Sequence, residues 1–194
     1  MTHQSIRIIR EEHAALSAML QSLRMMLTRG PKDEPERFFD VLRAMLFYID
    51  EFPERLHHPK ESAMLFPPVA ERSPHCHAVI AQLEKDHQTG ESNIRELQHL
   101  LVAWELLGDS RREAFEQAAY SFIDFYMQHM HMEETVVIPE ALKVLSDAEW
   151  KKLDTAFATH CDPLTGKYPR EPLYDRLFTR ITMNAPEPIG LGRH

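Results

Sequence analysis

The chain has 194 residues, 43% of them hydrophobic and 27% charged, a balance typical of one globular domain with a substantial core. The net charge of -8 at pH 7 argues against a nucleic-acid partner, because a phosphate backbone needs a basic face. No segment has the roughly 20 apolar residues of a membrane span, and the first residues lack the apolar stretch of a signal peptide. The only cysteines, Cys76 and Cys161, form no CxxC pair, so we expect a reducing, cytoplasmic location.

Helical periodicity dominates the first 70 residues. A first helix is predicted over about residues 5–28, because the segment 29–31, Arg-Gly-Pro, should end it. Asp33 is expected to cap a second helix. The interior prolines Pro53 and Pro59 should bend that helix, and Pro67-Pro68 should end it nearby.

Three further helices follow in the sequence. They are predicted over about residues 74–107, 111–144 and 147–159. Gly108 marks the break between the first two of these helices. Ser110 with Glu113, and Ser146 with Glu149, show the spacing of a capping box, in which each side chain binds the backbone of the other residue.

Long helices joined by short breaks favour antiparallel neighbours. The predicted fold is therefore all-α, an up-down-up-down four-helix bundle with a short fifth helix and a proline-rich C-terminal tail. We expect the bundle to occupy residues 1–160. Residues 161–194 should form a tail that packs on the bundle or is partly disordered, with a short helix near residues 174–181.

Twelve histidines need a separate explanation, and an internal repeat supplies it. The segment 57–61, HHPKE, aligns with 129–133, HMHME, at an offset of 72 residues. Upstream, Glu12-His13 aligns with Asp86-His87 at an offset of 74 residues. Each half of the chain therefore offers one histidine on its first helix and a His-x-x-x-Glu pair on its second.

Residues four apart lie on one face of a helix, so each His-x-x-x-Glu pair can turn both side chains inward. Imidazole with carboxylate suits iron, manganese or zinc, whereas calcium prefers oxygen ligands alone. One such pair is common on a solvated helix face, but two matched pairs with upstream histidines favour a buried two-metal site. The candidate metal ligands are His13, His57, Glu61, His87, His129 and Glu133.

The segments EEHAAL, FPERLHHPKE, EKDH and HMHMEETVVIP resemble the hemerythrin HHE cation-binding family over about residues 5–145. The resemblance implies a non-haem di-iron centre, two iron ions joined by an oxo or hydroxo bridge, with zinc or manganese as substitutes. It also implies that His13 and His57 bind one iron, that His87 and His129 bind the other, and that Glu61 and Glu133 bridge them.

The sequence departs from the oxygen-carrying members of that family. Those members have a further histidine where this chain has Leu83, which argues against reversible oxygen carriage. Their last carboxylate would select Glu134, whereas the internal repeat selects Glu133. His58 and His131 lie beside the ligands, but about 100° of rotation per residue should turn them off the inward face. We interpret them as outer or surface groups, and metal binding by His58 stays open as the alternative.

The function we favour is a non-haem di-iron protein that binds or senses oxygen or another small diatomic molecule, or handles iron. The alternatives are a di-iron enzyme that reacts with oxygen, peroxide or nitric oxide, iron supply for iron-sulfur cluster repair, and a metal-free interaction bundle. No appended signalling or DNA-binding domain is evident, so the output of a sensor would have to pass through an unidentified protein partner or through the tail. A homodimer is also expected, without nucleic-acid or membrane partners.

Overall fold

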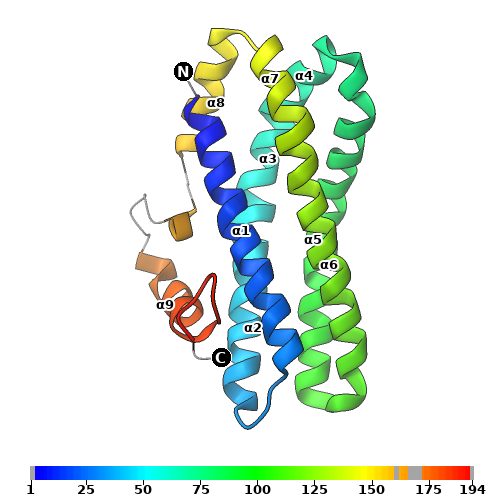
Figure 1. The fold of residues 1–194 in the computed structure, drawn as a ribbon, viewed down its shortest axis with the longest axis vertical. Coiled ribbons are helices and arrows are strands. Elements are labelled where there is room, and N and C mark those ends of the chain that lie inside the picture. Colours follow the sequence, from blue (N-terminus) through cyan, green and yellow to red (C-terminus); the bar gives the residue numbers. More distant parts are fainter. Residues whose placement is uncertain (1–2, 160–161, 166–171, 193–194) are drawn as a thin grey trace.

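The computed structural model describes residues 3–159, 162–165 and 172–192, and every regular element within these ranges is helical. Four long helices lie along one axis and form a bundle (Figure 1). They are α1 (Gln4–Arg29), α2 (Pro35–Ile49), α5 (His77–Leu107) and α6 (Arg112–Met132). Helix α1 contacts α2 and α6, and α5 contacts the same two helices. The all-α prediction is therefore confirmed, whereas the predicted domain boundary at residues 160–161 lies outside the described residues.

Glycine ends two of the long helices, as predicted. Gly30 follows α1 with φ of 68°, and Gly108 follows α5 with φ of 87°, a backbone region that side chains other than glycine rarely enter. Of the two predicted capping boxes, the one between Ser146 and Glu149 is confirmed at the start of α8 (Asp147–Ala158).

Two predicted helix caps are wrong. Ser110 lies within a 3-10 turn, Asp109–Arg111, and α6 begins after that turn without a side-chain cap. Helix α2 likewise starts after Glu34 rather than Asp33, again without a side-chain cap. In both places the chain enters the helix through a tight turn, so the polar side chain is not positioned at the first free N–H groups.

The second helical rod runs past Pro67-Pro68 and ends four residues later, close to the predicted end. After α2 it continues through four segments, η1 (Asp50–His57), α3 (His58–Lys60), η2 (Glu61–Leu65) and α4 (Phe66–Arg72). Both prolines lie in the first turn of α4, where a missing N–H does least harm. The rod ends at Arg72, five residues before α5 begins.

A π-helical turn lies at the same place in both halves of the bundle. Segments η2 and η5 (Glu133–Val137) are π-helical, and their bounds are 72 residues apart, like the predicted ligands. A proline is the second residue of the helix that follows each of them, α4 and α7 (Ile138–Val144). A proline cannot donate the usual hydrogen bond one turn back, and the wider π turn accommodates that gap.

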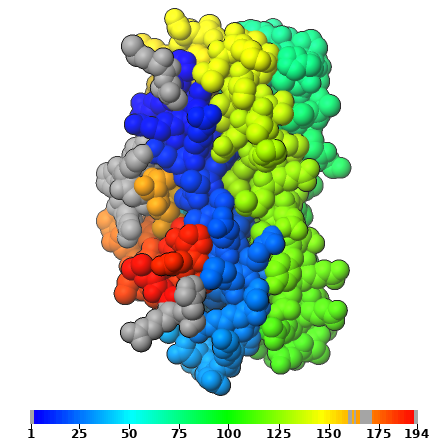
Figure 2. All heavy atoms as spheres, in the orientation of Figure 1, coloured from blue at the N-terminus to red at the C-terminus, as the bar shows by residue number. Residues whose placement is uncertain are grey.

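The C-terminal tail lies along the bundle. It contains the short turns Pro163–Thr165 and Pro172–Tyr174 and ends in α9 (Asp175–Asn184), close to the predicted short helix. Helix α9 packs on α2, and Phe178 and Ile181 are buried in the bundle core. In the space-filling view the tail covers one side of α1 and α2 (Figure 2).

Two apolar clusters fill the bundle, and a polar layer separates them. On α1, Ile6, Ile8 and Ile9 belong to one cluster and the buried apolar side chains of the segment 16–27 to the other, with buried Glu12 and His13 between them. On α5, Leu83 belongs to the first cluster and Ile94 to the second, with Asp86 between them. No helix in the described part of the chain is long and apolar enough to span a bilayer.

Candidate metal centre

All six predicted ligands meet in the polar layer. They come from α1 (His13), η1 (His57), η2 (Glu61), α5 (His87), α6 (His129) and η5 (Glu133). They form two groups, each with ligand atoms within 4.8 Å of one another. One group holds His13 and His57, the other holds His87 and His129, and both glutamates belong to both groups.

Each glutamate turns one oxygen towards each group. Glu133 Oε2 lies 3.2 Å from His13 Nε2, and its Oε1 lies 3.1 Å from His129 Nε2. Glu61 Oε1 lies 3.1 Å from His57 Nε2, and its Oε2 lies 3.7 Å from His87 Nε2. Two atoms that bind one ion at about 2.1 Å each are roughly 3 to 4 Å apart, so these spacings suit shared metal ligands.

Two acidic residues orient the histidines of the two His-x-x-x-Glu pairs, His57 and His129. His57 Nδ1 lies 2.6 Å from Glu12 Oε2, and His129 Nδ1 lies 3.3 Å from Asp86 Oδ2. A carboxylate beside Nδ1 keeps the proton on that nitrogen and leaves Nε2 with a free lone pair. These two acids precede His13 and His87 in the sequence, yet each supports the histidine of a neighbouring helix.

The residues that follow the two glutamates support the other two histidines. Glu134 Oε1 lies 2.9 Å from His13 Nδ1. Ser62 Oγ donates to Glu84 at 3.0 Å and therefore accepts from His87 Nδ1, 2.8 Å away. All four histidines thus present Nε2 to the layer, and Glu134, the alternative ligand in the sequence, instead binds the outer nitrogen of His13.

Several polar atoms at the middle of the layer lack a hydrogen bond although they are buried. They are the Nε2 atoms of His13 and His57 and both carboxylate oxygens of Glu61 and Glu133. Leaving such atoms unsatisfied is costly, and cations at the centre would satisfy all of them at once. The residues therefore fit a metal centre by their chemistry as well as by their spacing.

The negative charge of the buried carboxylates also favours bound protons or metal cations in the layer. Burial lowers the pKa of His129, but the nearby Glu133 carboxylate and a hydrogen bond to Asp86 outweigh it and raise the pKa to about 10. Burial likewise opposes the charged form of His57, yet Glu61 and Glu12 hold its pKa well above the ordinary value. The layer thus binds protons tightly, and cations bound to the same nitrogens would take their place.

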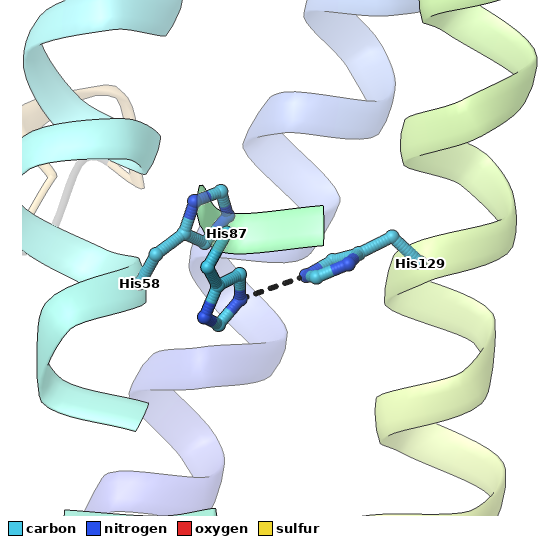
Figure 3. A group of neighbouring side chains, drawn as sticks. All are labelled: His58, His87 and His129. Carbon is cyan, nitrogen blue, oxygen red and sulfur yellow. Dashed lines mark hydrogen bonds between the residues drawn. The ribbon is translucent and has the colours of Figure 1, made fainter. Parts of the chain in front are cut away.

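His58 lies in the layer, contrary to its interpretation as an outer or surface group. It is 5% exposed, and its ligand atom lies within 4.8 Å of those of His87 and His129 (Figure 3). The rotation of about 100° from His57 to His58 turns the ring from α1 towards α5 and α6, which also border the layer, rather than towards solvent. His131, by contrast, is exposed as expected.

The tail closes a small cavity beside the layer. The cavity, of about 20 Å³, is lined by His13, His57 and His58 and by the apolar side chains of Leu16 and Leu56, among others. Such a volume has room for a water-sized molecule.

Asp162 of the tail also lines this cavity and links it to a tyrosine. Its backbone N–H donates to Glu12 Oε1 at 3.0 Å, and its carboxylate accepts from the Tyr48 hydroxyl. Burial raises the pKa of Asp162 to about 6. A chain of polar contacts therefore runs from His57 through Glu12 and Asp162 to Tyr48.

A comparison with family models finds one match that covers most of the bundle. The model described as the hemerythrin HHE cation binding domain matches residues 4–141. A search of curated proteins found no match. The matched residues include all six predicted ligands and end before the tail that closes the cavity.

Proposed function

Because the chain belongs to the hemerythrin HHE cation-binding family, we propose that it is a non-haem di-iron protein that binds or senses a small diatomic molecule such as oxygen, or handles iron. The family match supports a bound cation, typically iron. Two ions per chain, their oxo or hydroxo bridge and the diatomic ligand are our proposal. So is an up-down-up-down arrangement of α1, α2, α5 and α6.

One observation carries the case for two ions. Glu61 and Glu133 each turn one oxygen towards His13 and His57 and the other towards His87 and His129. A carboxylate that served a single ion would not need its second oxygen buried beside a second pair of imidazoles. The arrangement therefore supports one ion for each histidine pair, with the glutamates as bridges.

Residues outside the proposed ligand set orient the ligands, exclude water and limit the size of an exogenous ligand. Bound iron would supply reversible electron transfer and an open position for an exogenous ligand. Glu12, Asp86, Ser62 and Glu134 orient the imidazoles through Nδ1. The apolar clusters above and below the layer exclude bulk water. The small cavity favours a ligand of one or two heavy atoms over a larger organic molecule.

The enzyme alternative has one specific observation in its favour. Reduction of oxygen, peroxide or nitric oxide needs protons, and the contacts from His57 through Glu12 and Asp162 to Tyr48 lead away from the cavity. Steady consumption of peroxide or nitric oxide by the iron-loaded protein in the presence of an added electron donor, lost in Asp162→Asn, would favour this alternative. Iron supply for cluster repair has no comparable support in the structure.

Metal analysis tests the proposed function. Protein loaded anaerobically with iron(II) and freed of excess metal should hold about two irons per chain. Its optical spectrum should change on exposure to air as the irons are oxidised. His131→Leu, at an exposed histidine beside the site, is the matched control and should also hold two. One iron per chain in repeated preparations would rule out the dinuclear centre. A cytoplasmic location, a protein partner and a homodimer stay expectations.

A further inference from the structure

His58 is the one buried histidine of the layer to which the repeat assigns no role. It is the first residue of α3, and its counterpart in the second half, 72 residues later, is Met130. His57 faces α1, where it meets Glu12, whereas His58 faces α5 and α6. Its ring centroid lies 4.2 Å from that of His87 and 5.3 Å from that of His129. The second half of the repeat therefore has no equivalent of this side chain.

His58 is supported in the same way as the four predicted histidine ligands. Its Nδ1 lies 3.3 Å from Glu54 Oε2, one helical turn earlier, and Glu54 is itself buried. The four predicted ligands also meet an oxygen through Nδ1. A buried histidine that served only as packing would not need a buried carboxyl group at Nδ1. With that group ionised, as a bound cation would favour, Glu54 accepts from Nδ1 and leaves Nε2 free for metal.

The neighbouring helix makes room for this carboxylate. Gly90 lies in the interior of α5, where glycine is about 1 kcal/mol less favourable than alanine. A Cβ atom at position 90 would lie 2.5 Å from Glu54 Oε2 and 2.6 Å from Oε1. Only glycine therefore leaves the space that Glu54 occupies beside His58, and this is a physical reason for glycine at that position.

We infer that His58 is a third imidazole ligand of the ion held by His87 and His129, and that Glu54 orients it. The inference rests on the proposed di-iron function. It makes the centre asymmetric, because the ion at His13 and His57 keeps two imidazoles. That ion has fewer protein ligands and is therefore the one left open to the exogenous ligand. The cavity borders both ions, since His58 and His129 line it as well as His13 and His57.

The rings of His58 and His87 stack with an angle of 12° between their planes. Two imidazoles that bind one ion through Nε2 point at it from different directions, so these rings must turn apart when the ion binds. The inference therefore predicts a measurable change in the environment of both rings on metal loading.

Imidazole nitrogen NMR of the intact chain loaded with zinc tests this without any variant. Five Nε2 resonances should move to the position typical of metal-bound nitrogen, those of His13, His57, His58, His87 and His129. Four such resonances, with His58 unchanged, would overturn the inference but leave the two-metal centre intact. If the chain binds a single zinc, the proposed dinuclear function fails. The inference then stands if His58 is bound with His87 and His129, and falls if it is not.

Metal titration of three variants and one control variant gives a second test. In His58→Leu, one of the two binding steps for zinc or iron(II), measured against a competing chelator, should weaken by at least about 100-fold while the other changes little. Glu54→Gln should weaken the same step by roughly 10-fold to 100-fold, as expected for an orienting partner, and Gly90→Ala should mimic it by displacing Glu54. His131→Leu is the matched histidine control and should change neither step. Unchanged titrations in both His58→Leu and Glu54→Gln would refute the inference.

Discussion

Raising the pH from about 6.5 to 9 should destabilise the protein stripped of metal, whereas the zinc-loaded protein should stay stable. Burial lowers the pKa of His129, but Glu133 and Asp86 outweigh it and raise the pKa to about 10. The folded state therefore holds this proton more tightly than the unfolded state does. That stabilisation is complete below the ordinary value of 6.5 and is lost as the pH rises towards 10.

The loss in the free energy of unfolding can be calculated for His129 alone, before the other groups are added. Each pH unit between 6.5 and about 10 is worth about 1.4 kcal/mol, so about 3 kcal/mol is lost by pH 9. For a chain of this length this loss corresponds to a fall in Tm of roughly 6 to 12 °C. The raised pKa values of His13 and His57 act in the same direction. So does Glu54, whose burial raises its pKa to about 8 and makes its charged form unfavourable in the folded state.

Thermal unfolding followed by circular dichroism, in metal-free buffers at a series of pH values, measures this fall. Zinc-loaded protein should keep its Tm over this range and lose stability only in mild acid, where protons compete with the metal for imidazole. His129→Gln should flatten the curve of the stripped protein, and His131→Leu should leave it unchanged. A Tm of the stripped protein that is constant or rises over this range would refute the charge balance derived for the layer.

The other predictions concern single side chains. Glu133→Ala should reduce the metal content from two ions per chain to one at most. Glu134→Ala removes only the partner of His13 Nδ1 and should weaken metal binding by roughly 10-fold. A larger loss of metal in Glu134→Ala than in Glu133→Ala would show that Glu134 is the ligand. Leu83→Ala should lower the free energy of unfolding by about 2–5 kcal/mol in urea without changing the metal content, because this leucine is fully buried in the apolar cluster. Ser146→Ala should cost about 1 kcal/mol through loss of the α8 cap, and an unchanged urea midpoint would contradict it.

The pairing of histidine with glutamate could be predicted because it depends on local geometry alone. His57 with Glu61, and His129 with Glu133, are four residues apart, and helical periodicity turns both members of such a pair to one side. Repetition of the pattern then indicated that the two pairs face each other. The π-helical turns begin at the glutamates and so leave this spacing intact.

His58 could not be placed from the sequence, because periodicity does not show which neighbouring helix a side chain faces. The turn from His57 carries His58 away from α1 but towards α5 and α6, which border the same layer. Two signals were nevertheless present. Glu54 precedes His58 by four residues, and Gly90 stands in a long helix that otherwise avoids glycine.

The supporting acids show a different limit. Glu12 and Asp86 stand beside His13 and His87 in the sequence, and the repeat made both pairs visible. Which histidine each acid serves is decided by how the helices pack, since each binds an imidazole on another helix rather than its neighbour in the chain. Periodicity assigns a side chain to a face of its helix but does not identify the partner across the gap.

The hydrogen bonds of Ser62 and Glu134 cross between the two repeats. Ser62 belongs to the first repeat and supports His87 of the second, while Glu134 of the second supports His13 of the first. Neither repeat can therefore orient its own full set of imidazoles when the other is missing or undocked. A chain split between Arg72 and His77, or one permuted to begin there, would regain tight metal binding only on reassembly, so retained metal would report that both pieces are correctly joined.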